Sequence, residues 1–176
     1  MDGGLLAAMR PGSVLVNHGT GLPAFAAEMT RLAAGHGVDV LDAPVSGGRA
    51  GAVARQLTTI VGGDAAVVQR LRPFFETFSK KVAHMGGPGA GQAGKLINNA
   101  LLMANQKNIA DLLAIAQQLD IEIPALVDVL RSGTAASVAL QALGTAITPA
   151  TPSTCTRCSW LTWTSSPKRW LRSATA

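Results

Sequence analysis

Apolar residues in the first half of the chain alternate between strand-like runs and helical spacing. Four short apolar runs bounded by glycine or polar residues have the pattern of buried strands: residues 13–17, 38–41, 57–61 and 81–85. Residues 23–34 and 65–78, which lie between these runs, place apolar side chains at helical spacing, as a short segment over residues 3–9 also does. Strands separated by helices predict a mainly parallel sheet with right-handed crossovers.

The pattern becomes purely helical after the glycine cluster at residues 86–94. One long run covers residues 93–119, and two shorter helices are predicted over residues 124–131 and 135–143. Pro124 suits the first turn of a helix, where its missing N–H group costs nothing. We therefore predict an α/β protein in which a partial Rossmann-type parallel sheet is joined by a long helix to an all-α domain. The expected domains are residues 1–88, 89–150 and a tail, 151–176.

The tail differs in composition from the rest of the chain. It holds all three tryptophans, both cysteines (Cys155 and Cys158) and four basic residues without an acid. The chain carries a net charge of +5, and without those four residues the balance is +1, which argues against a polyanionic partner such as nucleic acid. We expect the tail to be disordered and hypothesise that its reading frame is shifted near residues 149–154. We do not interpret its C-x-x-C spacing as a redox or zinc site.

No apolar run reaches the roughly 18 residues that a membrane helix needs, so no membrane span is predicted. The residues after Met1 lack the basic region and the small-residue cleavage site of a signal peptide. From these two features we expect a cytoplasmic protein.

A first candidate site follows the predicted strand at residues 38–41. The segment Asp42-Ala43-Pro44-Val45-Ser46-Gly47-Gly48 lies at a strand's carboxyl end, where open α/β sheets bind ligands. Ser46 offers a hydroxyl group, and Gly47 and Gly48 allow backbone N–H groups to approach a carboxylate. Taken alone, the segment also suits an ordinary turn from strand to loop.

A second candidate site lies at the start of the long helix. Lys95 and Asn99 are four residues apart on that helix, so they share a face and can address one ligand. The glycine-rich start offers free N–H groups to an anion, and a desolvated lysine can exchange protons near neutral pH. A solvated lysine in an ordinary helix start fits the same residues.

Residues 89–95 also spell G-x-x-x-x-G-K, most of a nucleotide-triphosphate loop. That loop requires serine or threonine after the lysine to hold Mg²⁺, and Leu96 stands there instead. A P-loop-like nucleotide binder is therefore a minor alternative.

Taken together, the two motifs resemble those of the β-hydroxyacid dehydrogenase family, which includes 3-hydroxyisobutyrate dehydrogenase. The resemblance joins DAPVSGG, the downstream pairs Gly51-Ala52 and Leu57-Thr58, and the spacing G-x-G-x-x-x-K-x-x-N-N that ends at Asn99. It extends over roughly residues 3–145. It implies an oxidoreductase that transfers hydride between a 3-hydroxy acid and NAD or NADP, related also to 6-phosphogluconate dehydrogenase.

The resemblance implies a role for each candidate residue. Lys95 would be the catalytic acid/base, assisted by Asn99, which would hold the substrate. Ser46, Gly47 and Gly48 would bind the substrate carboxylate, and Thr20 would lie near the nicotinamide ribose. Lysine at position 95 favours alcohol oxidation over the imine-reducing branch, and family members commonly form homo-oligomers through the helical domain.

The chain departs from the family at both ends, and the C-terminal departure is the tail at residues 151–176, which lies outside the family pattern. Family members begin with a strand, a G-x-G-x-x-G turn and a helix that seat the pyrophosphate, and residues 1–12 contain no such unit. We therefore expect a fragment in which residues 1–88 are the C-terminal part of a dinucleotide-binding domain, with impaired activity. Arg55 and Gln56 stand where the family usually has Gly-Thr. The alternative is a non-catalytic remnant that acts as an oligomerising helical module.

Overall fold

A computed structural model describes residues 4–143, and these residues divide into two compact units. The first unit extends to Ile97 and the second begins at Asn98, so the boundary lies within a single long helix. The domain boundaries expected at residues 88 and 150 stay predictions. Our interpretation of residues 151–176 concerns a part of the chain outside the described residues.

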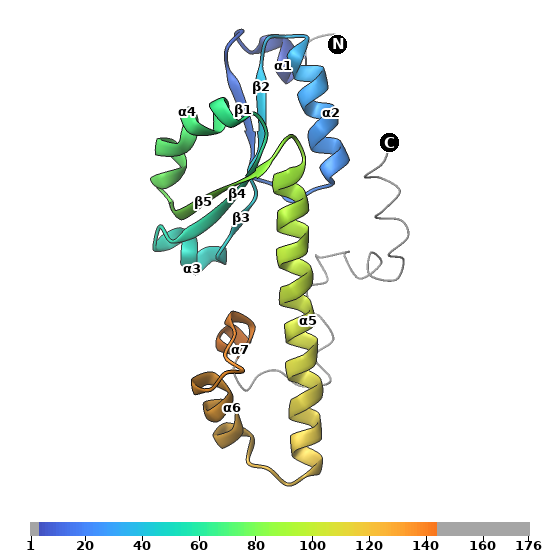
Figure 1. Cartoon of the computed structure of the whole chain (residues 1–176), viewed down its shortest axis with the longest axis vertical. Coiled ribbons are helices and arrows are strands. Elements are labelled where there is room, and N and C mark those ends of the chain that lie inside the picture. The colour runs from blue at the N-terminus through green and yellow to red at the C-terminus, as the bar shows by residue number, and fades with distance from the viewer. Residues whose placement is uncertain (1–3, 144–176) are drawn as a thin grey trace. The chain divides into compact units, whose positions relative to one another are not determined.

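The first unit is a five-stranded sheet with helices (Figure 1). Its strands are β1 (Val14–Asn17), β2 (Asp39–Asp42), β3 (Val45–Ser46), β4 (Leu57–Gly62) and β5 (Ser79–Gly86). Its complete helices are α1 (Leu5–Ala8), α2 (Pro23–Ala34), α3 (Gly48–Val53) and α4 (Ala65–Glu76). β3 and α3 are additional to the elements predicted from the sequence, because residues 43–56 show neither a clear strand nor a clear helical period.

Strand direction in the sheet is mixed. The pairs β1–β2 and β4–β5 are parallel as predicted, whereas β2 and β3 both run antiparallel to β4. Asp42 pairs with Gly62 and Val45 with Thr59 in one continuous register, so β2 and β3 are successive parts of one extended segment beside β4. The short α3 explains the reversal, because a parallel crossover needs a dozen or more residues.

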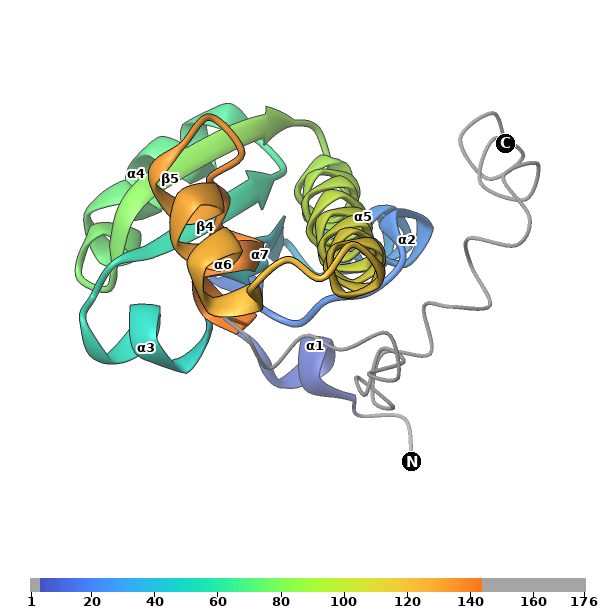
Figure 2. The same ribbon diagram turned by 90° about the horizontal axis from the view of Figure 1, so that it is seen from below.

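Each face of the sheet carries its own core. Ala33 of α2 packs with Val38 and Val40 on one face. On the other face, Phe75 of α4 packs with Leu41 and a set of buried or partly buried aliphatic residues: Val61, Val67, Val68, Val14 and Val16. Figure 1 shows α2 and α4 on opposite sides of the sheet, and Figure 2 shows α4 beside β5. Alternation along β2 therefore sends Leu41 to the α4 face and leaves Asp42 on the face of α2.

The second unit is helical. It contains most of α5 (Ala90–Gln118), together with α6 (Ile123–Ser132) and α7 (Val138–Leu143). Leu113 and Ala110 of α5 pack with Val127 of α6 in a small core. α5 ends where Asp120 adopts the left-handed conformation, with a φ of 54°. Within residues 4–143, no helix is both long and apolar enough to span a bilayer.

Arg55 is the only described residue besides Asp120 that has a positive φ without being glycine. Its φ of 55° disfavours a side chain, so we expect Arg55→Gly to raise the free energy of unfolding by about 1 kcal/mol. Ala54→Gly is the matched control: Ala54 has a φ of −80°, and the change should lower stability by about 0.5–1 kcal/mol. Urea unfolding of the two variants tests this, and equal effects in both would contradict it.

Candidate functional site

A buried carboxylate at the end of β2 holds the first turn of α5. Asp42 is 2% exposed, and its two oxygens accept hydrogen bonds from different backbone N–H groups. Oδ1 accepts from Gly89 N at 2.8 Å, and Oδ2 accepts from Gln92 N at 2.7 Å. The first N–H groups of a helix have no partner within the helix, so Asp42 satisfies two of these groups and also places its charge at the positive end of the helix dipole.

Two glycines allow this contact to form. A Cβ on Gly62 would lie 2.5 Å from Asp42 Oδ1, and a Cβ on Gly91 would collide with the Asp42 carbonyl oxygen and lie 2.6 Å from Ile60 O. The backbone of α5 therefore rests directly on β2 and β4, with no room for side chains between them. This close approach fixes where α5 leaves the sheet.

Gln92 connects α5 to the loop after β1. Its side chain is 1% exposed; Oε1 accepts from Gly21 N at 2.8 Å, and Nε2 donates to Gly19 O at 2.7 Å. These two bonds hold the loop on either side of Thr20, whose own side chain is exposed. No role was predicted from the sequence for Asp42 or Gln92.

Lys95 lies about one turn after Gln92 on α5, and its side chain is half-buried. Burial removes hydration from the ammonium group, which lowers the pKa of Lys95 below the usual lysine value. A larger fraction of the amine is then neutral near physiological pH than for a solvated lysine. This is the property that a proton acceptor requires.

The Ser46-Gly47-Gly48 segment leaves the sheet between β3 and α3. Ser46 pairs with Thr58 of β4, and the two glycines are exposed with φ values of 127° and 60°. A Cβ on Gly48 would meet nothing within 4 Å, so the backbone there faces open space. The positive φ values explain why glycine is needed, and the open surface leaves room for a ligand.

Asn99, the remaining predicted residue, follows Lys95 by four residues on α5 and belongs to the second unit. Its Oδ1 accepts a hydrogen bond from Asn98 Nδ2 at 3.2 Å. The structure thus joins the segments that carry Thr20 and Lys95 through Gln92, and it places Ser46 on the same extended segment as Asp42. The roles expected for all six residues stay predictions.

The same contacts change the interpretation of the glycine-rich segment. We expected its N–H groups to be free for an anion, but those of Gly89 and Gln92 bind the chain's own Asp42. A phosphate-binding loop needs such groups for its ligand, so a nucleotide-triphosphate loop here is disfavoured. Gly89, Gly91 and Gly94 also spell G-x-G-x-x-G, but Gly91 and Gly94 lie against the backbone and side chains of β4, and Gly89 lies against Pro23 of α2.

His18, for which no role was predicted, connects the end of β1 to the segment after β2. Its Nδ1 lies 2.7 Å from the Ala43 carbonyl oxygen and must be the donor in that bond. The ring packs edge-on against Phe75 and Phe78, with centroids 6.0 and 5.7 Å away. The side chain is therefore held in place by these contacts.

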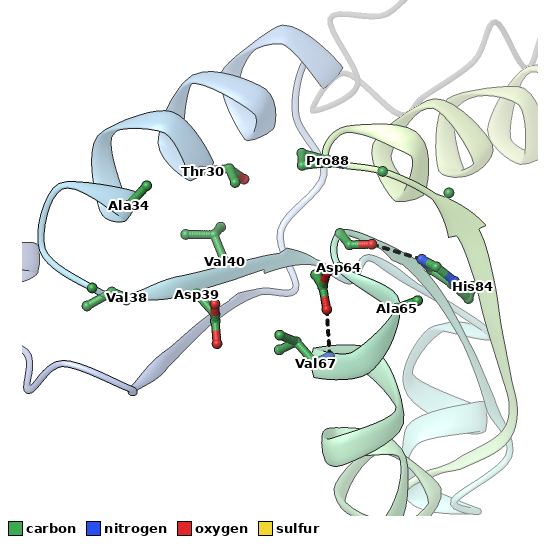
Figure 3. A pocket seen from close by; sticks show the side chains of 14 residues that line it. Thr30, Ala34, Val38, Asp39, Val40, Asp64, Ala65, Val67, His84 and Pro88 are labelled. Carbon is green, nitrogen blue, oxygen red and sulfur yellow. Dashed lines mark hydrogen bonds between the residues drawn. The ribbon is translucent and has the colours of Figure 1, made fainter.

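A cavity of about 810 Å³ lies elsewhere in the first unit, and none of the predicted site residues lines it (Figure 3). Thr30 of α2, Asp39 of β2, Asp64 before α4 and His84 of β5 are among its lining residues. His84 Nε2 donates to the Gly63 carbonyl oxygen at 2.9 Å, which is a structural contact.

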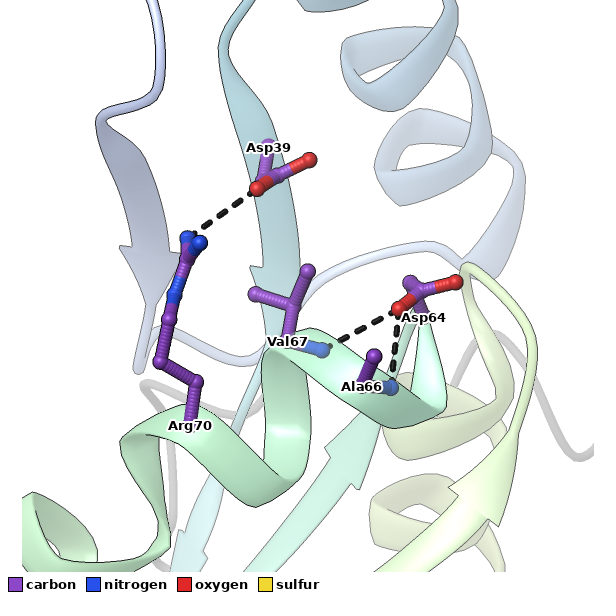
Figure 4. A network of polar contacts seen from close by, with 5 residues as sticks. All are labelled: Asp39, Asp64, Ala66, Val67 and Arg70. Carbon is purple, nitrogen blue, oxygen red and sulfur yellow. Dashed lines mark hydrogen bonds and ion pairs between the residues drawn. The ribbon is translucent and has the colours of Figure 1, made fainter.

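The two carboxylates of this cavity also have structural roles (Figure 4). Asp64 caps α4 by accepting from the backbone N–H groups of Ala66 and Val67, and Asp39 pairs with Arg70 at 3.1 Å. These polar side chains of the cavity therefore stabilise the fold. The site around Asp42, Gln92 and Lys95 is the better functional candidate.

Two family models match the chain over most of its length. Residues 1–87 match a family model described as the NAD binding domain of 6-phosphogluconate dehydrogenase. Residues 89–153 match one described as NAD-binding of NADP-dependent 3-hydroxyisobutyrate dehydrogenase. Both models describe dehydrogenases that use a nicotinamide cofactor.

Individual relatives are similar at 38–41% identity. An NAD-dependent L-serine dehydrogenase of Pseudomonas aeruginosa is 38% identical over 140 residues, which is 80% of this chain and 47% of the relative. A probable 3-hydroxyisobutyrate dehydrogenase of Mycobacterium bovis is 41% identical over 74% of this chain and 44% of its own. The structure of Mycobacterium tuberculosis 3-hydroxyisobutyrate dehydrogenase with L-serine superposes with a TM-score of 0.70 at 40% identity, covering 76% of this chain and 46% of that one. The chain therefore spans about half the length of the relatives it matches.

The lowered pKa of Lys95 predicts how one substitution changes stability with pH. The pKa of Lys95 is lower in the folded than in the unfolded state, so the lysine destabilises the fold at any pH at which it is protonated in both states. The free energy of unfolding then rises as pH increases from the folded-state pKa toward the unfolded-state pKa. We therefore expect Lys95→Met to raise the free energy of unfolding at neutral pH, and this gain to shrink as pH rises through that interval.

Lys107→Met is the control, because Lys107 is an exposed lysine of α5 paired with Asp111. Urea unfolding of both variants at several pH values between neutral and alkaline checks the prediction. A Lys95→Met effect that is independent of pH, or that matches Lys107→Met at every pH, would contradict it.

Proposed function

Because the chain belongs to the β-hydroxyacid dehydrogenase family, we propose that it carries the substrate and proton-transfer part of an oxidoreductase that moves hydride between a 3-hydroxy acid and NAD or NADP. The observation that carries the proposal is the half-buried Lys95 of lowered pKa, on a helix anchored at the end of β2. The matching relatives supply the reaction class.

Lys95 takes the proton in this proposal. Oxidation of a secondary or primary alcohol requires the hydroxyl proton to leave as the C–H bond breaks, and neutral Lys95 Nζ would accept it. In the reverse direction the ammonium form would return it. Asn99, four residues further along α5, would hold the substrate.

Ser46, Gly47 and Gly48 would bind the substrate carboxylate. The left-handed backbone of both glycines and the open space over Gly48 support this role, because N–H groups in such a turn can face an anion. Relatives named for L-serine and for 3-hydroxyisobutyrate share one chemistry, a hydroxyl group on the carbon β to a carboxylate. We propose a small hydroxycarboxylic acid of this kind as the substrate.

The loop around Thr20 fits the nicotinamide end of the cofactor. It lies at the carboxyl end of β1, Thr20 is exposed, and a Cβ on Gly21 would meet nothing within 4 Å. Thr20 would contact the nicotinamide ribose, and the bound cofactor would supply hydride acceptance. The chain's own residues bind and orient the two reactants and move the proton.

Substitution of Lys95 tests the proposal directly. We expect the purified chain to reduce NAD or NADP with 3-hydroxyisobutyrate or L-serine at an impaired rate, and Lys95→Ala to lower this kcat by about a further 10²–10⁴-fold. Lys107→Ala, on the same helix, should leave turnover unchanged. Absence of turnover with both nucleotides in the unaltered chain, or equal loss in both variants, would refute the proposal for this polypeptide.

We also propose that the helical unit mediates self-association. Leu101, Leu112, Ile115 and Leu119 of α5 are all at least 50% exposed, and their spacing places them on one face of the helix. An exposed apolar stripe of this length marks a protein interface more often than a solvated surface. The expected cytoplasmic location and the expected lack of nucleic-acid or membrane partners stay predictions.

Charge placed on this stripe should weaken the association. We expect the chain to sediment as a dimer or larger species, and Leu112→Lys combined with Ile115→Lys to raise the dissociation constant at least about a hundredfold, since each buried aliphatic contributes ~1.5–3 kcal/mol. Gln117→Lys is the control, because Gln117 is exposed on another face of α5. A monomeric unaltered chain at all concentrations would contradict the prediction.

A further inference from the structure

Two segments of the proposed site are far apart in sequence and meet through a single side chain. Thr20 follows β1, and Lys95 lies in the first turns of α5. The Gln92 amide reaches Gly21 N and Gly19 O across 71 and 73 residues of sequence, with distances of 2.8 and 2.7 Å. The amide thus holds both ends of a three-residue loop whose central residue is Thr20.

The chemistry of this contact requires an amide. One end of the Gln92 side chain must accept a hydrogen bond from an N–H group while the other donates to a carbonyl oxygen. An ionised glutamate has the same shape but cannot donate to Gly19 O. Methionine has a similar length and can fill the volume, but it makes neither bond. Gln92 is nearly fully buried, so the amide is not simply solvated polar surface.

Asp42 also holds Gln92 in place, through the backbone N–H group of Gln92. Its Oδ2 accepts from the backbone N–H of Gln92 itself, and its Oδ1 accepts from Gly89 at the start of the helix. Gln92 is therefore held by its backbone to the end of β2 and by its side chain to the loop after β1. A displacement of the helix start would have to break bonds at both sites.

We infer that Gln92, held by Asp42, is a positioning residue that fixes the Thr20 loop relative to Lys95. The inference rests on the proposed function, in which Thr20 lies on the cofactor side and Lys95 accepts the proton. In such a site the distance between hydride acceptor and proton acceptor sets the rate, because a small misplacement of reacting groups slows the reaction strongly. Gln92 fixes the position of the Thr20 loop relative to Lys95 and does not itself contact the substrate.

Hydrogen exchange of the backbone N–H of Gly21 tests the contact in the 176-residue chain without any ligand. In Gln92→Met we expect this amide to exchange about tenfold faster or more, because its hydrogen-bond acceptor is gone. Amides of α4 should be unaffected. The matched control is Gln69→Met, the same change at an exposed position of α4.

Gln92→Glu adds a readout that a merely structural role would not move. Its carboxylate cannot donate to Gly19 O, but a protonated carboxyl group can both donate and accept. The exchange of Gly21, measured as a ratio to the unaltered chain at each pH, should therefore fall back toward one as pH decreases through the pKa of this carboxyl group, which burial raises above the usual glutamate value of about 4.3. The ratio for Gln92→Met should show no such recovery.

The inference is overturned if Gly21 exchanges equally fast in the unaltered chain and Gln92→Met, or if α4 amides accelerate to the same extent. Where the chain turns over, Gln92→Met should lower kcat about tenfold and change KM for the hydroxy acid less than about twofold, whereas a change in KM alone would contradict a positioning role. Hydrogen exchange needs neither nucleotide nor substrate. Absence of turnover would therefore refute the proposed function, whereas the exchange result alone would decide this inference.

Discussion

The contact between the Asp42 carboxylate and the first turn of α5 is the constraint from which the arrangement of the candidate site follows. A buried carboxylate is costly unless hydrogen bonds satisfy its oxygens, and a helix start has N–H groups without partners. The carboxylate oxygens of Asp42 accept hydrogen bonds from the backbone N–H groups of Gly89 and Gln92 at 2.7–2.8 Å, which satisfies both sets of groups. The pairing requires glycine at positions 62 and 91, because a side chain at either would separate the two elements. With the helix start fixed, Gln92 reaches the loop after β1, and Lys95 takes its place one turn further on.

This use of the helix start separates the chain from proteins that bind phosphate there. The helix dipole and the free N–H groups of a glycine-rich turn form a general anion site. In this chain two of these N–H groups, those of Gly89 and Gln92, bind the internal Asp42 carboxylate, and this contact holds the helix start in place. The proposed chemistry therefore rests on Lys95, whose pKa is lowered by burial, and on the open glycine turn at Gly47 and Gly48.

The short connection between β3 and β4 has a second effect on the site. Because α3 has only six residues, β4 returns antiparallel to the segment formed by β2 and β3. Gly62 is thereby placed opposite Asp42, where the absence of a side chain admits α5. A longer crossover would have allowed a parallel strand and brought other residues to this position.

Elements whose patterns are local could be predicted from the order of the amino acids alone. Apolar spacing placed α2 and the other long helices and four of the five strands within a few residues, and the two motifs identified the family and pointed to Lys95. The roles of Asp42 and Gln92, the antiparallel β4 and the commitment of the Gly89 and Gln92 N–H groups were decided only by the tertiary structure. The reason is physical: periodicity reports which side of an element is buried, whereas the partner of a buried polar group lies 47–73 residues away in sequence and is chosen only when the sheet and α5 pack together.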